Sequence, residues 1–502
     1  MIECGKDDED IESWFISKWI SDLLQSEMTI TGKYLISRGF KEGKRIGAIL
    51  KEFGSLFEDF PICDDWGKVE LILEKHRAQQ DLEDAQKLQT IPMLNINQTV
   101  QPFFNIVVID PIEEENVEKV KLTIEEMVRV PTVVGVAVFP DACPSGNSAP
   151  VGTVFGAKNA IHPSWHSADI CCSMFATNFG KRDPKLVMDQ AFDVTHFGRG
   201  GRPREDEIPL PDPLMELLKH HTEDNHFFND QKLQYCIRSH FATQGDGNHF
   251  LFVGQSQKTG DTWMVTHHGS RGFGARLYKS AMKIAETHRQ RICPDVPKIH
   301  AWIPFDSDDG LNYFRALEYL SSWTQASHQA IHSLVSKPLR IKVRDQYWNP
   351  HNHVFMEKKS DGIPIFWHAK GATPVDQKFM HDTKGVQIIP LSMADPILLV
   401  TGTTTNTNHG FAPHGAGRNM SRTQHRKSKA GQTIEEILAE ETAGLDIRFF
   451  GGDPDITELP SAYKCADTVE SQIKRFNLAT IVDKIQPYGS IMCGHQDWSR
   501  RR

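Results

Sequence analysis

The sequence lacks the features that mark membrane and secreted proteins. No apolar run approaches the roughly 20 residues needed to span a bilayer, and Met1–Asp10, which is acidic, lacks the basic and then apolar layout of a secretory signal. The nine cysteines are odd in number and are scattered without the spacing of a disulfide framework. We therefore expect a cytoplasmic protein that works in a reducing environment and has no membrane partner.

The sequence also has no excess of positive charge. Its 56 Lys and Arg residues are outnumbered by 65 Asp and Glu residues, for a net charge of −9. This balance argues against a protein whose whole surface is basic and grips nucleic acid without sequence preference. A local basic groove is still compatible with it, because Lys and Arg cluster within 418–427.

The 502 residues divide by character near residue 90. Residues 1–90 are predicted to be mostly helical, with glycines such as Gly39 and Gly43 separating short helices. After Pro92 apolar β-branched runs appear, and these predict buried strands. No repeat of solenoid length is present. We expect a helical N-terminal extension, 1–90, followed by one large catalytic domain, 91–502.

The large domain is predicted to have an α+β fold, with central β-sheets flanked by helices. Phe104–Ile109 and Thr132–Phe139 are apolar runs bounded by turn residues, as in buried strands, and Leu122–Val128 between them is expected to be helical. Apolar residues at three- and four-residue spacing predict long helices farther along the chain. These helices cover about 275–289, 311–335 and 433–441.

Asp169-Ile170-Cys171-Cys172 is the first of several segments that carry metal-ligand side chains. In a strand or tight turn, Asp169 and one of the two cysteines would point at usable angles. A carboxylate with a thiolate suits a borderline divalent metal better than magnesium or calcium. The alternative is a pair of buried cysteines that act as small hydrophobic residues.

Three histidine segments follow. Gly245–Phe250 is a glycine turn before a strand, in which His249 could bind a metal while the Asn248 amide holds a phosphate oxygen. His267–Gly272 follows a strand and precedes a helix, as in an anion-binding nest. His351–Glu357 begins with a His-Asn-His sequence. Each segment alone also fits structural histidines, but their combination in one chain indicates a metal centre.

His414-Gly415-Ala416-Gly417-Arg418 places an imidazole among small residues beside a guanidinium. The glycines let the backbone approach a ligand closely, and the guanidinium can hold a phosphate in a two-point fork. A histidine in this setting can act as a nucleophile toward an activated phosphorus. The alternative for this segment is an ordinary turn.

Taken in order, these motifs resemble those of the RtcB family of RNA ligases. The family's Asp-Ile-x-Cys-Gly corresponds to 169–173, and its Gly-x-Gly-Asn-His-Phe to 245–250. Three further motifs are intact, and the weaker matches are Pro140-Asp141 and 150–154, so that the resemblance covers roughly residues 90–494. The intact motifs are His267–Gly272, His351–Glu357 and His414–Arg422.

The resemblance implies a manganese-dependent ligase with two bound Mn²⁺ ions. Cys172 would be shared between the ions, and His414 would attack the α-phosphate of GTP to give a guanylate linked to its ring nitrogen. The guanylate would pass to an RNA 3′-phosphate, itself opened from a 2′,3′-cyclic phosphate, and an RNA 5′-hydroxyl would then displace GMP. The implied metal ligands are Asp169, Cys172, His249, His267 and His351.

The resemblance also implies further contacts and partners. Arg271 and Arg418 would bind RNA phosphates, the biological setting would be tRNA splicing or RNA repair, and an archease-type protein could serve as activator. The implied nucleotide-binding residues are Asn248, His249, Phe250, Leu251, Phe252, His351, Asn352, Pro390, Leu391, Ser392, Met393, Ile397, His414, Gly415, Ala416, Gly417 and Cys493.

The chain departs from the family pattern around the guanine base. Phe252 stands where the family has Glu, Ile397 where it has Ser, and Cys493 where it has Lys. Loss of these polar side chains should loosen or change the choice of base without altering the metals or the nucleophile. Cys143 and Ser173 are smaller departures in the substrate groove.

Two other functions remain as alternatives. One is a metal-dependent phosphodiesterase or phosphatase acting on cyclic-phosphate RNA ends. The other is a non-catalytic protein that binds RNA ends. The presence of His414 together with the metal-ligand set Asp169, Cys172, His249, His267 and His351 favours the ligase.

Overall fold

A computed structural model describes residues 29–57, 60–61, 65–87, 90–380 and 385–495, and it forms two compact units, 1–90 and 91–502. The acidic N-terminal residues considered above lie outside the described residues. Within the first unit, the helices are α2 (Gly32–Ser37), α3 (Lys44–Leu56) and α4 (Trp66–Lys87). Gly39 and Gly43 fall between α2 and α3 with positive φ angles, as the glycine spacing predicted. Leu35, Phe53 and Leu73 are fully buried in the core of this unit.

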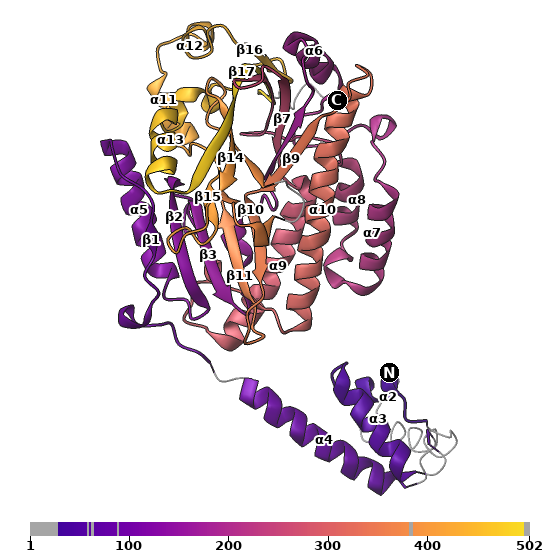
Figure 1. Cartoon of the computed structure of the whole chain (residues 1–502). Helices are drawn as coiled ribbons and strands as arrows, with labels where there is room; N and C mark the ends of the chain where they lie inside the picture. The colour runs from indigo at the N-terminus through magenta and orange to yellow at the C-terminus, as the bar shows by residue number, and fades with distance from the viewer. Residues whose placement is uncertain (1–28, 58–59, 62–64, 88–89, 381–384, 496–502) are drawn as a thin grey trace, which may run out of the picture. The chain divides into compact units, whose positions relative to one another are not determined.

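The second unit is built on a large mixed sheet (Figure 1). Seven strands lie in the spatial order β13-β14-β17-β6-β7-β5-β9, and β16 pairs in parallel with β17. The remaining neighbours are antiparallel. The strands are β5 (Ser173–Asn178), β6 (Phe250–Ser256), β7 (Thr262–His268), β9 (Asp345–Pro350), β13 (Val386–Ile389), β14 (Ile397–Gly402), β16 (Asp446–Phe449) and β17 (Ala479–Met492).

A smaller five-stranded sheet has the order β1-β2-β3-β11-β10. Buried residues such as Phe139 and Trp367 of this sheet pack in one cluster with Ile389 and Leu398 of the large sheet. Two further sheets have two antiparallel strands each, β12 with β15 and β4 with β8. The strands are β1 (Phe103–Phe104), β2 (Val133–Cys143), β3 (Val151–Lys158), β4 (Ala160–Ile161), β8 (Ile303–Pro304), β10 (Asn352–Glu357), β11 (Ile365–Lys370), β12 (Ala372–Pro374) and β15 (Phe411–Pro413).

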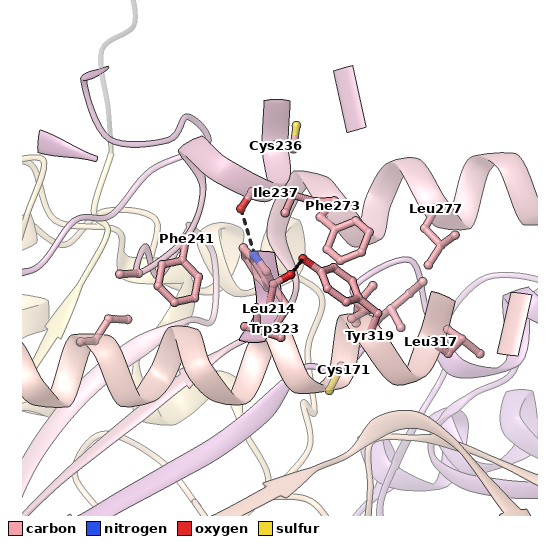
Figure 2. Packing of buried hydrophobic residues seen from close by; sticks show 14 of the residues in the cluster. Cys171, Leu214, Cys236, Ile237, Phe241, Phe273, Leu277, Leu317, Tyr319 and Trp323 are labelled. Carbon is pink, nitrogen blue, oxygen red and sulfur yellow. Dashed lines mark hydrogen bonds between the residues drawn. The ribbon is translucent and has the colours of Figure 1, made fainter. Parts of the chain in front are cut away.

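Helices flank the sheets, and α7 to α10 gather on one side (Figure 1). The long helix α10 buries Trp323, whose indole nitrogen donates to the carbonyl of Ile237 (2.9 Å), and Tyr319, whose hydroxyl donates to that of Leu214 (3.3 Å; Figure 2). The helices are α5 (Pro111–Met127), α6 (Pro184–Val194), α7 (Asp212–Asp224), α8 (Gln231–Ser239), α9 (Arg271–Ile292), α10 (Asp308–Ser336), α11 (Arg422–Ser428), α12 (Ile434–Glu441) and α13 (Ala466–Arg475). The α+β prediction is confirmed.

One strand prediction is wrong. Only Phe103–Phe104 pairs as β1, and the chain leaves the sheet after Asn105, although 104–109 is apolar. Beyond it, the backbone of Val107 bonds to the Gln472 side chain on both its N–H and its carbonyl (2.8 and 3.0 Å). A side-chain amide thus takes the place of a neighbouring strand, which no local pattern could show.

The helix predicted at 122–128 is longer than expected and begins at Pro111. Asp110 caps it by accepting from the N–H of Glu113 (2.8 Å), and Pro111 occupies the first turn. Both are ordinary start signals for a helix. Among the described residues, no helix is both long and apolar enough to cross a membrane.

Candidate active site

The motif segments converge on a cavity of about 430 Å³ in the second unit. Strands β6 and β7 contribute Phe250 and His267, and the turn before β5 contributes Asp169 and Cys172. His351 precedes β10. The cavity therefore draws together segments that lie far apart in the sequence, as a site assembled by the fold does.

The five residues expected to bind metal form two groups of three that share Cys172. One group is Cys172, His267 and His351; the other is Asp169, Cys172 and His249. Within each group the ligand atoms lie within 4.8 Å of one another. The Cys172 sulfur lies 3.1 Å from Nε2 of His267 and 3.6 Å from Nε2 of His249. Each group could hold one divalent cation, with Cys172 common to both.

Backbone carbonyls fix the orientation of two of these histidines. Nδ1 of His249 donates to the carbonyl of Gln244 (2.7 Å), and Nδ1 of His267 donates to that of Asn248 (3.1 Å). Because a carbonyl only accepts, each ring carries a proton on Nδ1. Nε2 of His267 is left to offer its lone pair to the cluster, whereas Nε2 of His249 faces Oδ2 of Asp169 (3.0 Å). The donor set of carboxylate, thiol and imidazoles fits a borderline divalent metal.

The turn before β5 sends the two adjacent cysteines in different directions. Cys171 has a positive φ of 57° and packs among the residues of α8, α9 and α10 (Figure 2). Cys172 faces the cavity instead. Gly269 is essential to this arrangement, since a Cβ there would lie 2.1 Å from Oδ1 of Asp169. The pattern of residues left open which cysteine faces the site, and the structure selects Cys172.

Burial controls the charge of the cluster. It lowers the pKa of His267 to about 3, so that this imidazole is neutral and free to donate a lone pair. Burial raises the pKa of the Cys172 thiol, and the neighbouring Asp169 carboxylate raises it further. Burial opposes ionisation of Asp169 too, but the charge and hydrogen bond of His249 outweigh it and bring its pKa to about 2.

His414 lies beside this cluster, with its ring centroid 4.9 Å from that of His351. Its Nδ1 donates to Oδ2 of the fully buried Asp141 (2.5 Å), and its backbone N–H donates to the same oxygen (3.0 Å). The proton therefore sits on Nδ1, and Nε2 keeps its lone pair. Gly371 is required here, because a Cβ would lie 2.9 Å from the ring.

Motif analysis did not assign a role to several polar residues of the cavity. Lys370 is buried and donates to the hydroxyls of Ser145 (2.8 Å) and Ser148 (3.2 Å). Burial lowers its pKa to about 8. Glu458 and Tyr463 also line the cavity and hydrogen-bond to each other. Nothing in the sequence around Lys370 indicates that this residue lines a site. Asp141 was singled out only as part of the weak match Pro140-Asp141.

Most of the expected nucleotide-binding residues line the cavity. They are Asn248, Phe250, Phe252, His351, Asn352, Pro390, Leu391, Ser392, Met393, Ile397, His414, Ala416 and Gly417.

Leu251 does not join them, and its expected nucleotide contact is corrected. Successive side chains of a strand alternate between faces, so that Phe250 and Phe252 face the cavity side while Leu251 is fully buried in the opposite core. Gly415 is absent from the residues that line the cavity, although its neighbours Ala416 and Gly417 line it.

A second cavity of about 730 Å³ adjoins the metal-ligand cluster and shares Asp169, Asn248 and Arg422 with the first. His249 and Cys493, both expected to touch the nucleotide, line this second cavity. Burial raises the pKa of the Cys493 thiol to about 11. Cys493 therefore lines a different cavity from Phe252 and Ile397, which line the first.

The two arginines expected to bind RNA phosphate are both held by the protein. Arg271 lines the second cavity, and its Nη2 donates to the carbonyl of Gly198 (2.6 Å). Arg418 lines the first cavity and donates to Glu458 (3.0 Å), which Arg422 also contacts (2.7 Å). Two guanidinium groups therefore share one carboxylate, which leaves a net positive charge at this end of the first cavity.

Comparison with known proteins decides the family. The family model described as tRNA-splicing ligase RtcB matches residues 216–493, more than half of the chain. The chain belongs to the RtcB family. This match includes the four histidines of the site and the apolar residues Phe252 and Ile397.

Curated relatives carry the same or a similar description. The tRNA-splicing ligase RtcB of Archaeoglobus fulgidus is 24% identical over 441 residues, which cover 74% of this chain and 90% of that protein. That of Thermococcus kodakarensis is 25% identical over 75% of this chain and 92% of that protein. The RNA-splicing ligase RtcB of Escherichia coli is 25% identical over 66% of this chain and 84% of that protein.

Proposed function

We propose that this protein is an RNA ligase that joins RNA ends through a nucleotide attached covalently to His414. The observation that carries the proposal is the position of the His414 ring beside His351 of the metal-ligand cluster, with Asp141 holding its Nδ1 proton. Membership of the RtcB family, whose curated relatives are described as tRNA-splicing ligases, supports the same conclusion.

His414 is suited to act as the nucleophile. Asp141 accepts from Nδ1, so that the lone pair of Nε2 is directed away from it, and a neutral imidazole is not repelled by a triphosphate. Nε2 would attack the α-phosphorus of GTP, forming the N–P bond as the bond to pyrophosphate breaks. Asp141 would stabilise the positive charge that the ring acquires, as the carboxylate of a catalytic triad does.

The residues present fit a pair of divalent cations, for which we propose Mn²⁺. Asp169, Cys172 and His249 would hold one ion, and Cys172, His267 and His351 the other. The mixture of thiolate, imidazole and carboxylate donors disfavours the hard cations Mg²⁺ and Ca²⁺. Such ions neutralise the charge on phosphate oxygens and lower the pKa of bound water.

The substrates would be RNA with a 3′-phosphate or 2′,3′-cyclic phosphate and RNA with a 5′-hydroxyl. The 3′-phosphate would take the guanylate from His414, and the 5′-hydroxyl would then displace GMP to form the phosphodiester. Arg271 and Arg418 lie in the two adjoining cavities, where their charge would attract RNA phosphates. An archease-type protein would serve as activator.

The biological setting that we propose is tRNA splicing or RNA repair in the cytoplasm. The seven cysteines in the described part of the chain are free thiols, and Cys172 has to remain reduced to bind a metal. A reducing compartment keeps it so.

Ligation of synthetic RNA tests the proposal. The full-length protein is incubated with Mn²⁺, GTP, an RNA ending in a 2′,3′-cyclic phosphate and a labelled RNA beginning with a 5′-hydroxyl. A joined product that requires GTP and is lost in His414→Ala supports the ligase. Ring opening without GTP and without joining would instead show the alternative phosphodiesterase. RNA binding with no product under any condition would indicate a non-catalytic binding protein.

A further inference from the structure

We propose that the nucleotide's base is held against an apolar wall of the central cavity and is selected by shape, so that ATP serves as well as GTP. This inference rests on the proposed function and specifies its nucleotide. The apolar wall consists of Phe250, Phe252, Leu391, Met393, Ile397 and Met492.

The apolar wall is continuous. Phe252 and Ile397 pack in one buried cluster, Met393 and Met492 pack in another, and Phe250 contacts both clusters. Cross-strand pairing places Met492 opposite Phe250 on β17 and β6. Two aromatic rings and flexible sulfur-containing side chains offer a flat, adaptable surface, on which the ring system of a base stacks.

The apolar wall starts at the reactive groups. The ring of Phe250 lies 5.3 Å from that of His267 in the metal-ligand cluster. On the other side, a Cβ at Gly415, next to His414, would lie 3.0 Å from the carbonyl oxygen of Pro390, which leads into Leu391. A nucleotide whose α-phosphate meets His414 therefore has this apolar surface within reach of its base.

The rest of the cavity has the opposite character. Lys370, Arg418 and Arg422 line it, and the two arginines share the carboxylate of Glu458. Lys370 bonds to the hydroxyls of Ser145 and Ser148 rather than to a carboxylate. A cavity with cations on one side and aromatic and aliphatic side chains on the other matches the two halves of a nucleoside triphosphate.

The polar groups next to the apolar wall do not distinguish adenine from guanine. Ser490 pairs across the strands with Phe252 and also lines the cavity, and a hydroxyl can donate to one base and accept from the other. Ser392 Oγ already bonds to Asp395 (2.5 Å). Among the described residues that line the cavity, the carboxylates are Asp169, which bonds to His249 of the metal-ligand cluster, and Glu458, which bonds to Arg418 on the cationic side.

Selectivity therefore has to come from apolar contact, since the Ser490 hydroxyl can serve either purine. A site that hydrogen-bonds its substrate rejects an analogue without those groups by about 10⁴- to 10⁵-fold, whereas an apolar pocket separates similar shapes by roughly 10- to 200-fold at most. Adenine and guanine have the same bicyclic shape, so that the two purines should differ little. Pyrimidines cover less of the wall and should react more slowly.

The test compares nucleotides on the full-length protein with Mn²⁺. GTP, ITP, ATP and UTP are supplied one at a time below saturation, and the initial rate of covalent adduct formation is followed by intact-protein mass spectrometry. We expect the three purine nucleotides to agree within about tenfold, because they share one ring system and an apolar pocket discriminates weakly between similar shapes. A preference for GTP over ATP of more than about 1,000-fold would overturn the inference, because it requires hydrogen bonds to the base.

A variant pair tests the location of the base. Phe252→Glu places a carboxylate in the apolar wall, where it can accept from the adjacent N–H and amino groups of guanine at once, whereas adenine offers only its amino group beside an acceptor nitrogen. We expect it to raise the GTP-to-ATP rate ratio at least tenfold. Gln255→Glu, on the exposed side of the same strand, is the matched control and should leave the ratio unchanged.

A folding control accompanies these variants. If thermal unfolding shows that Phe252→Glu does not fold, Met393→Glu at the edge of the apolar wall takes its place. An unchanged ratio in a folded variant would show that the base lies elsewhere and would overturn the inference. Failure of all four nucleotides to form an adduct would refute the proposed function itself, whereas an adduct with GTP alone would refute only this inference.

Discussion

At the scale of single residues, the site depends on contacts that fix where protons sit. His249, His267 and His414 each direct Nδ1 to an oxygen that can only accept, two of them to a backbone carbonyl and His414 to Asp141. The same rule leaves Nε2 of His267 and of His414 with a lone pair, whereas Nε2 of His249 faces the carboxylate of Asp169 (3.0 Å). The ability of these rings to bind metal or attack phosphorus thus follows from their hydrogen-bond partners.

Asp141→Asn tests this dependence at His414. The amide keeps the shape of the side chain but can offer an N–H to the ring, which favours the wrong tautomer and stabilises no positive charge. By analogy with the buried aspartate of a catalytic triad, adduct formation should fall on the order of 10³- to 10⁴-fold. Quenched-flow rates of adduct formation measure the change. Asp361→Asn, at an exposed ion pair with Lys158, is the control, and an equal effect of both variants would contradict the account.

Lys370 predicts a pH dependence of nucleotide binding. Its pKa is about 8 because burial disfavours the charged form, so that the side chain is a cation below this pH and neutral above it. Triphosphate affinity should therefore weaken as the pH rises from 7 to 9. Equilibrium dialysis with labelled nucleotide on the His414→Ala variant measures binding without the covalent step.

The control for Lys370 is a second variant. Adding Lys370→Met should weaken triphosphate binding at pH 7. The affinity of this variant should then no longer change around pH 8. The pH dependence of unfolding gives an independent check: between pH 8 and 10.5 the unfolded chain holds a proton on this lysine that the folded chain has lost, so that Lys370 contributes stability that rises with pH over this range. If nucleotide affinity and the free energy of unfolding depended on pH identically with Lys370 and with Met at this position, this role for Lys370 would be contradicted.

At the scale of secondary-structure elements, α10 is tied to the strands behind the metal-ligand cluster by a polar ladder. Thr266 Oγ1 on β7 contacts Nδ1 of His328 (2.7 Å) and Nε2 of His332 (2.9 Å), and these rings also contact Ser173 (3.0 Å) and Thr177 (2.7 Å) on β5. All five residues are buried. Thr266 and Ser173 directly adjoin His267 and Cys172 in the sequence, so that the ladder supports the strand ends that carry the site.

Thr266→Val tests the ladder. Valine keeps the shape but leaves two buried ring nitrogens without a partner, which should lower the free energy of unfolding by about 1–3 kcal/mol. Urea denaturation measures this loss. Thr123→Val on α5, where the half-buried side chain bonds through Oγ1 to a backbone carbonyl of its own helix, is the matched control and should change stability by less than about 0.5 kcal/mol. Equal losses in the two variants would contradict the structural role of the ladder.

Elements with strong local patterns could be predicted from the sequence, and contacts between distant segments could not. The helices predicted at 275–289, 311–335 and 433–441 correspond to α9, α10 and α12, because their periodicity reflects a buried face. The segment 105–109 is apolar but is bound by Gln472, more than 360 residues away. The same limit hid Lys370, whose place in the cavity is set by the pairing of β10 with β11.

At the scale of the whole molecule, the chain consists of two compact units, and all residues of the candidate site belong to the second. The first unit has its own buried core, which includes Leu35, Phe53 and Leu73. The second unit contains both sheets and both cavities. We propose on this basis that 91–502 is the catalytic domain and that 1–90 is a helical extension.

Removal of residues 1–90 tests this division. Because the core and the site lie within the second unit, the truncated protein should unfold cooperatively and form the nucleotide adduct within about threefold of the full-length rate. Calorimetry and intact-protein mass spectrometry measure the two properties. Loss of adduct formation in a truncated protein that still unfolds cooperatively would show that the first unit takes part in the reaction.

The central claim is that His414 carries the nucleotide during the reaction. Locating the covalent nucleotide adduct on the protein tests this claim most directly. The full-length protein is incubated with Mn²⁺ and GTP, and mass spectrometry of its peptides locates the added nucleotide monophosphate. The account predicts one phosphoramidate on His414 that is lost in acid, survives in alkali and does not form when a chelator has removed the metal beforehand. An adduct on another residue, or one that persists in His414→Ala, would contradict it.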